Sequence, residues 1–155
     1  MRINVGVTAY DIAERFLGTS EMHGRLNNPQ IMAMLKLDNS WPAADEVPWC
    51  SAFVSYICWL LDLPRSKSLR ARSWLKVGRV IRLEEAVRGF DVVVLSRGPN
   101  APGPDVIDAP GHVGFFSHTL GENADLMLLG GNQGDSVSTR PHPRNRVLGV
   151  RRLLP

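Results

Sequence analysis

The sequence predicts an α+β domain with helices in the first half of the chain and consecutive strands in the second. Apolar residues recur at helical spacing before residue 80, whereas short β-branched runs between glycine- and proline-rich turns follow it. Helices first and strands afterwards are typical of a mostly antiparallel sheet packed on a central helix. The length of 155 residues suits one hydrophobic core, so we expect a single domain spanning residues 1–155.

Four helices are expected in the first half of the chain. The first has Thr8 as its N-cap and Gly18 at its end, and the second starts at Pro29 behind an Asn28 N-cap. The third is apolar on nearly every face, so we expect it to be the buried central helix. The predicted helices cover residues 9–17, 51–61 and 68–75, together with a helix that starts at residue 29 and whose apolar residues extend to residue 35.

Four strands are expected in the second half, at residues 92–95, 112–116, 126–129 and 147–153. The first two are separated by residues 97–111, which hold four prolines and three glycines. Such a long loop in a small domain is usually functional. We therefore expect it to take part in ligand binding.

Composition excludes several classes of protein. With 44% hydrophobic and 21% charged residues, the chain is neither disordered nor fibrous. No apolar run reaches the roughly 18 residues of a membrane helix, so we expect no stable membrane insertion. The N-terminal stretch lacks the pattern of a signal peptide, so we expect synthesis in the cytoplasm.

Charge is unevenly distributed along the chain, whose net charge is +3. Residues 1–64 carry four basic and seven acidic side chains, and the remainder carries 14 basic and 8 acidic ones. Such an excess usually forms a solvated basic face, and it can also attract a polyanion. No groove-reading motif accompanies the C-terminal arginines, so we expect no nucleic-acid partner.

Cys50 is the most informative residue of the chain. It follows Pro48-Trp49 in the first turn of the buried helix, where unpaired backbone N–H groups and the helix dipole lower a thiol pKa. We therefore expect a nucleophile with a pKa well below ~8.5. Cys58 lies mid-helix in the core, and a helical spacing of about 12 Å between the two Cα atoms predicts two free thiols.

His112 is the expected base, because it begins a strand beside a loop where it can exchange protons with solvent. Asn132 and Gln133 end the third strand, and antiparallel pairing brings that end beside His112. We expect Asn132 to orient the imidazole. The rival orienting residues are Glu122, Asp125 and Asp135, and the less favourable histidines are His23, His118 and His142.

Three segments together resemble a known family: residues 45–54 with Pro48-Trp49-Cys50, residues 111–115 and residues 130–135. The set is similar to the papain-like cell-wall cysteine peptidases, the NlpC-type and CHAP (cysteine, histidine-dependent amidohydrolase/peptidase) group. It is most similar to a compact branch common in phages and prophages. Glu21 and residues 68–75 also look like that branch, so the resemblance covers nearly the whole chain.

The resemblance implies a papain-like fold and a peptidoglycan hydrolase with Cys50 as nucleophile, His112 as base and Asn132 as the third residue. Trp41, Trp49 and Gln133 would contact the substrate. Stem-peptide cleavage is favoured, as by a phage or prophage endolysin, and the alternative is an N-acetylmuramoyl-L-alanine amidase. We expect a monomer that reaches the cell wall through a pore, a secretion machine or a phage particle.

Two other classes of function are weaker. A metal hydrolase would use Cys50, His112, His118 and an aspartate, but no pair of these has metal-ligand spacing, so we expect no metal and no other cofactor. A non-catalytic cell-wall-binding or phage-tail module would have a degenerate site, whereas all three catalytic residue types are present. The sequence therefore favours the enzyme.

Overall fold

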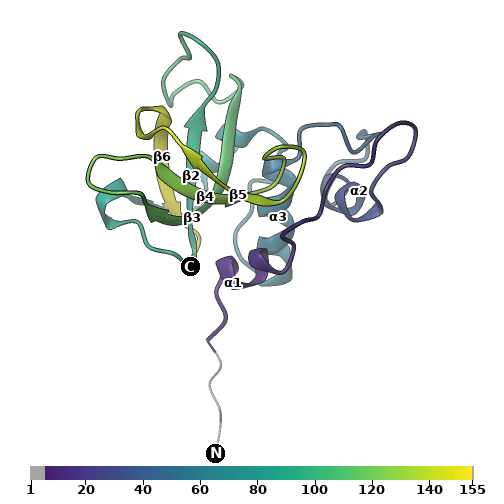
Figure 1. The fold of residues 1–155 in the computed structure, drawn as a ribbon, viewed down its shortest axis with the longest axis horizontal. Helices are drawn as coiled ribbons and strands as arrows, with labels where there is room; N and C mark the ends of the chain where they lie inside the picture. The colour runs from purple at the N-terminus through teal and green to yellow at the C-terminus, as the bar shows by residue number, and fades with distance from the viewer. Residues whose placement is uncertain (1–5, 155) are drawn as a thin grey trace, which may run out of the picture.

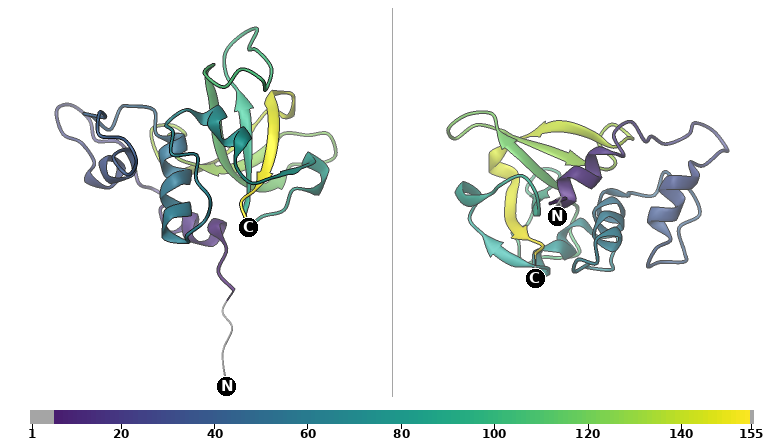
Figure 2. Two further views of the ribbon diagram at one scale, coloured as in Figure 1. Left: turned by 180° about the vertical axis from the view of Figure 1, so that it is seen from behind. Right: turned by 90° about the horizontal axis from the view of Figure 1, so that it is seen from below.

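A buried helix, α3 (Cys50–Leu60), lies between a six-stranded sheet and the smaller helix α2 (Pro29–Leu35) in the computed structural model, which describes residues 6–154. The two opposite views agree on this order of sheet, α3 and α2 (Figures 1 and 2). The short helix α1 (Ala9–Glu14) packs against both α3 and the sheet. The expected arrangement of a sheet on a central helix is confirmed.

The sheet has the strand order β1-β6-β2-β3-β4-β5, and every neighbouring pair is antiparallel. The strands are β1 (Arg79–Ile81), β2 (Asp91–Ser96), β3 (Gly111–Thr119), β4 (Leu126–Gly130), β5 (Ser138–His142) and β6 (Val147–Arg152). Three 3₁₀ turns connect them or precede them: η1 (Ala71–Lys76), η2 (Leu83–Glu85) and η3 (Arg144–Arg146). Four strands were expected, and the additional two, β1 and β5, are the edges of the sheet.

The sequence pattern does not reveal the additional strands, because β1 has only three residues and β5 lacks aliphatic and aromatic hydrophobic residues. β5 reads Ser-Thr-Arg-Pro-His and pairs only with β4. Proline is tolerated there because an edge strand has one row of backbone groups without a ladder partner. β5 matters for the candidate site because the strand ends at His142.

Helix α3 is apolar because it is enclosed by both layers. Phe53 and Ile57 are fully buried, and the Phe53 ring meets Phe115 of β3 edge to face at 6.2 Å between centroids. This confirms the prediction of a buried central helix. Cys50 and Cys58, its two cysteines, are both free thiols, as expected.

Helix α1 is shorter than its apolar pattern suggests. Its N-terminus has the expected Thr8 cap, closed by reciprocal hydrogen bonds with Asp11. It ends at Glu14, because the amides of Phe16 and Leu17 bond three residues back and so tighten the chain into a turn. The fourth predicted helix likewise forms a 3₁₀ turn, η1.

Arg72 of η1 holds the long loop 97–110 in place. Its side chain is fully buried, and its guanidinium donates to four backbone carbonyls of the loop. These acceptors are Pro102, Gly103, Val106 and Pro110, at 2.8–3.2 Å. The loop that rises above the sheet in Figure 1 is therefore fixed by a buried cation beneath it.

The hydroxyl of Ser51 fastens η1 to the start of α3. It donates to the Ser68 carbonyl at 2.6 Å and accepts from the Trp74 indole N–H at 2.8 Å. Arg72 and the loop are thereby placed beside Cys50. Within residues 6–154, no helix is long and apolar enough to cross a bilayer.

Candidate active site

Cys50 opens α3 and is 5% exposed, at the bottom of a hollow of about 230 Å³. The loop 97–110 forms one wall of this hollow and the segment before η1 forms another. Its lining residues are Pro48, Cys50, Leu69, Arg70, Ala71, Arg97, Asp108, Ala109, Pro110 and Gly111. The thiol therefore lies where an extended substrate could reach it.

Burial raises the pKa of the Cys50 thiol above its ordinary value. The backbone amide of Val113, next to His112, opposes this rise, as does the positive charge of Arg97. The expectation of a lowered pKa was wrong, because the loss of solvent outweighs the helix-start amides. Burial also raises the pKa of Cys58, to about 12.

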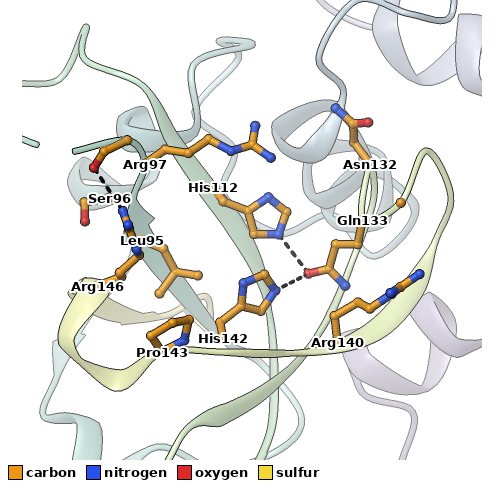
Figure 3. Close-up of a pocket in the computed structure, with 12 residues that line it drawn as sticks. Leu95, Ser96, Arg97, His112, Asn132, Gln133, Arg140, His142, Pro143 and Arg146 are labelled. Atoms are coloured by element: carbon orange, nitrogen blue, oxygen red, sulfur yellow. Dashed lines mark hydrogen bonds between the residues drawn. The ribbon is translucent and has the colours of Figure 1, made fainter.

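His112, near the start of β3, is buried and shares one acceptor with a second histidine. Its Nε2 lies 2.8 Å from Oε1 of Gln133, and Nε2 of His142 lies 2.8 Å from the same oxygen (Figure 3). The two imidazoles stack with 5.0 Å between centroids. The pair and the glutamine therefore form one unit.

The orientation of the Gln133 amide is fixed by its own hydrogen bonds. Its Nε2 donates to the carbonyls of Leu128 (3.2 Å) and Ser138 (2.7 Å), so its Oε1 has to face the imidazoles. An amide oxygen only accepts, so each imidazole has to donate from Nε2. In the neutral form of His112, Nδ1 then carries the free lone pair that a general base needs.

Both imidazoles are neutral near pH 7. Burial lowers the pKa of His112 to about 4, against a smaller opposing effect of its hydrogen bond to Gln133. Burial also lowers the pKa of His142 to about 4, and the neighbouring charges of His112 and Arg97 act in the same direction. Burial thus favours the neutral form both of the His112 imidazole and of the Cys50 thiol.

His112 lines a larger hollow, of about 410 Å³ (Figure 3). Arg97 lines both hollows and so lies between the cysteine and this second space. The lining residues are Leu95, Ser96, Arg97, Gly98, His112, Asn132, Gln133, Gly134, Arg140, His142, Pro143 and Arg146.

The structure brings Gln133, and not Asn132, into hydrogen bonding with His112. Asn132 has a left-handed backbone (φ 57°) and lines the larger hollow. The sequence placed His142 in a polar loop, because β5 was not expected. Only the alternation along β5, with His142 at its end, could have indicated an inward-facing imidazole.

Two adjacent glycines allow this close packing. A Cβ on Gly130 would lie 3.0 Å from Gln133 Oε1 and 3.3 Å from His112 Nε2. A Cβ on Gly131 would lie 2.7 Å from the Trp49 ring and 2.6 Å from Phe53 Cβ. The chain after β4 can therefore approach α3 this closely only with glycine at position 131, whereas a side chain at position 130 would require Gln133 or His112 to shift by a few tenths of an ångström.

The two tryptophans expected to contact substrate have different positions. Trp49 is fully buried, and its indole N–H donates to Glu21 Oε1 at 2.9 Å, so it supports the site from within the core. Trp41 is 65% exposed and lines neither of the two hollows.

Of the rival residues, His142 belongs to the unit around His112, and none of the others hydrogen-bonds to His112. The exposed His118 pairs with the Ser117 hydroxyl at 2.9 Å instead. In the described part of the chain, no hydrogen bond joins His112 to an acidic side chain. Nor do three His, Cys, Asp or Glu side chains gather there as metal ligands.

Comparison with known proteins shows a likeness of fold. No family model matches the sequence, and no curated protein matches it. Among solved structures, that of NlpC1 from Trichomonas vaginalis superposes with a TM-score of 0.57 at 16% identity, covering 98% of this chain and 46% of that one. The chain thus spans less than half of that neighbour. The likeness supports the papain-like fold, and with the helices and antiparallel sheet it confirms the α+β class.

Proposed function

We propose that this protein is a cysteine hydrolase that cleaves an amide bond in the peptide part of peptidoglycan, with Cys50 as nucleophile and His112 as base. One observation carries the proposal: the fixed Gln133 amide leaves a lone pair on Nδ1 of a buried imidazole, and the backbone of the next residue, Val113, acts to lower the pKa of the Cys50 thiol. The fold shared with NlpC1 and the resemblance of the three sequence segments support the substrate class.

The reaction starts from a neutral pair. His112 Nδ1 takes the thiol proton as the Cys50 sulfur attacks the amide carbonyl, and the oxyanion is held partly by the backbone N–H at the start of α3. The tetrahedral intermediate collapses when His112 returns the proton to the leaving amine. Water, deprotonated by the same imidazole, then hydrolyses the thioester and restores the thiol.

In this scheme, Gln133 and His142 are positioning residues. Gln133 holds the Nε2–H tautomer of His112, and its Oε1 also accepts from His142. When His112 gains a proton, the shared oxygen can stabilise the imidazolium, as the third member of a triad does. Asn132 was the residue expected to orient the imidazole, and a variant at that position provides the comparison.

The two cysteines offer the sharpest test. Cys50→Ala should abolish the release of new amino groups from purified sacculi and leave the fold intact. His112→Ala should abolish the same release of amino groups. Cys58→Ala should keep activity and lose about 1 kcal/mol or more of unfolding free energy, because it truncates a buried side chain. Activity in Cys50→Ala, or none in a folded Cys58→Ala, would contradict the assignment. Sacculus binding without any release by the wild type would indicate a wall-binding module.

We propose an endopeptidase acting within the stem peptide, on the family resemblance, with N-acetylmuramoyl-L-alanine amidase as the alternative. Glycosidic chemistry needs two opposed carboxylates. The carboxylate of Asp45 has a structural role instead, since its Oδ2 accepts hydrogen bonds from the backbone amides of Met22 and Asn28. Mass spectra of digested peptidoglycan should show disaccharides that carry truncated peptides, whereas free disaccharides with intact peptides would mean an amidase.

For the cellular role we propose lysis as a phage or prophage endolysin, which rests on the same resemblance. Co-expression with a membrane-pore protein should lyse bacterial cells, and the Cys50→Ala variant should not. Unchanged turbidity with the active protein would contradict this role.

A further inference from the structure

Three arginines from three parts of the chain surround the larger hollow. Arg97 directly follows β2, Arg140 lies on β5 and Arg146 belongs to η3. In Figure 3 they stand on different sides of the two imidazoles, with Arg97 extending over His112 toward Asn132. The hollow thus concentrates positive charge beside the base.

No acidic side chain balances this charge. The lining contains neither aspartate nor glutamate. The ion pairs among residues 6–154 join other arginines to their carboxylates, and Arg97, Arg140 and Arg146 have none within 4.0 Å. Like charges facing a common space repel, and an anionic occupant removes that cost.

One of the three guanidiniums, that of Arg146, is tied to the backbone beside the hollow, and a second, that of Arg140, lies close to Gly134. Arg146 donates to the Gly98 carbonyl at 3.1 Å, which ties η3 to the start of the loop that follows β2. Arg140 lies across Gly134, where an added Cβ would be 2.8 Å from its Nη2. Their remaining N–H donors suit a carboxylate, which guanidinium binds through paired hydrogen bonds.

The position of the larger hollow indicates which part of a substrate would bind in it. His112 lines it, and Arg97 lines both this hollow and the one that contains Cys50. A peptide whose scissile carbonyl lies at Cys50 would therefore place a neighbouring residue among the arginines. The volume of about 410 Å³ falls in the range of small-ligand pockets.

We propose that Arg97, Arg140 and Arg146 form a carboxylate-recognition subsite, which makes the substrate an acidic peptide with a free carboxylate next to the scissile bond. The identity of the substrate rests on the proposed function. Stem peptides whose side carboxylates are amidated would then be poor substrates, because a neutral amide cannot replace the charge-assisted hydrogen bonds.

The test compares two stem peptides of one sequence, with side carboxylates free in one and amidated in the other. Wild-type protein should favour the free form by about tenfold in kcat/KM, the size expected for one charged hydrogen bond. Arg140→Gln and Arg146→Gln should lose most of this preference through KM. Arg82→Gln is the matched control and should keep the preference. It changes the net charge by the same amount, and Arg82 lies outside the hollow, where it pairs with Glu85.

Binding to the Cys50→Ala protein separates this proposal from the proposed function. The dissociation constant of the free-carboxylate peptide should rise about tenfold when Arg140→Gln is added, and that of the amidated peptide should not change. Wild type that cleaves neither peptide, with this binding pattern intact, would overturn the hydrolase and keep the subsite. Equal cleavage and equal binding of both peptides, unaffected by the arginine changes, would overturn the subsite and keep the hydrolase.

Discussion

Gln133 makes the hydrogen bonds that connect the proposed site. Its side-chain amide bonds to carbonyls of two strands, β4 and β5, and to two imidazoles. Gln133→Ala should lower kcat about 100-fold or more, since His112 loses the acceptor that fixes its tautomer. It should also cost about 2 kcal/mol or more of stability, because buried carbonyls and N–H groups are left without partners. Activity is measured on sacculi, with circular dichroism confirming the folded fraction.

The matched variant is Asn132→Gly, which suits the left-handed backbone at that position, whereas alanine would be strained there. We expect it to keep most of the activity. If Asn132→Gly were as inactive as Gln133→Ala, the orienting role would return to Asn132, the residue expected from the sequence.

The thiol pKa gives a second prediction for a single residue. Because burial holds the pKa of Cys50 above its ordinary value, alkylation by iodoacetamide should be slow at pH 7 and should rise through alkaline pH. The rate constant is measured against pH in the Cys58→Ala background. A rate that is already level below pH 7 would indicate a resting thiolate and contradict the neutral pair.

Local patterns in the sequence were enough to propose Cys50 and His112, because each proposal depends on immediate neighbours: a proline and a helix start for one, and Pro-Gly before a strand for the other. The third residue depends on long-range pairing. Which of Asn132 and Gln133 turns inward is decided by the β4–β5 pairing, and five polar residues of an edge strand do not reveal that pairing. The direction of the thiol pKa was missed for a similar reason, since burial belongs to the tertiary structure.

At the scale of elements, the loop 97–110 depends on Arg72. Arg72→Met keeps an unbranched apolar stem and removes every hydrogen bond from this side chain to the loop, so hydrogen exchange of residues 98–110 should accelerate at least about tenfold. Activity should fall with it, because the loop walls the Cys50 hollow.

Arg70→Ala is the control for this element. Arg70 also reaches the loop, but its contact with Asp108 spans 4.0 Å between two exposed side chains and contributes little. Exchange in the loop should therefore stay near the wild-type rate. Equal acceleration in both variants, or in neither, would remove Arg72 as the loop's support.

Helices and central strands were predictable because their apolar residues follow a helical or alternating period. The ends of elements and the edge strands were less predictable. Helix α1 tightens into a turn before its apolar pattern stops, β1 is too short to show a period, and β5 lacks aliphatic and aromatic hydrophobic residues. The loop was recognised by its prolines and glycines. Its anchor was not, because a buried arginine facing carbonyls 30 to 38 residues away leaves no local trace.

For the whole molecule, the lowered histidine pKa links stability to pH. His112 has a pKa of about 4 in the folded chain against 6.5 ordinarily, so the unfolded chain binds the proton more readily. Stability should be full above pH 6.5 and fall as the pH drops toward 4, by on the order of 3 kcal/mol for His112. Urea unfolding midpoints of wild type and His112→Asn at several pH values measure the difference. Parallel curves for the two proteins would contradict the buried neutral imidazole.

The edges of the sheet have a consequence for how copies of the molecule meet. β1 is only three residues long and begins with Arg79, and β5 carries Arg140 and Pro141. A charged side chain and a residue without an amide hydrogen are poor templates for a further strand. The same five residues that bring His142 to His112 thus also make this edge a poor template for the sheet of another copy.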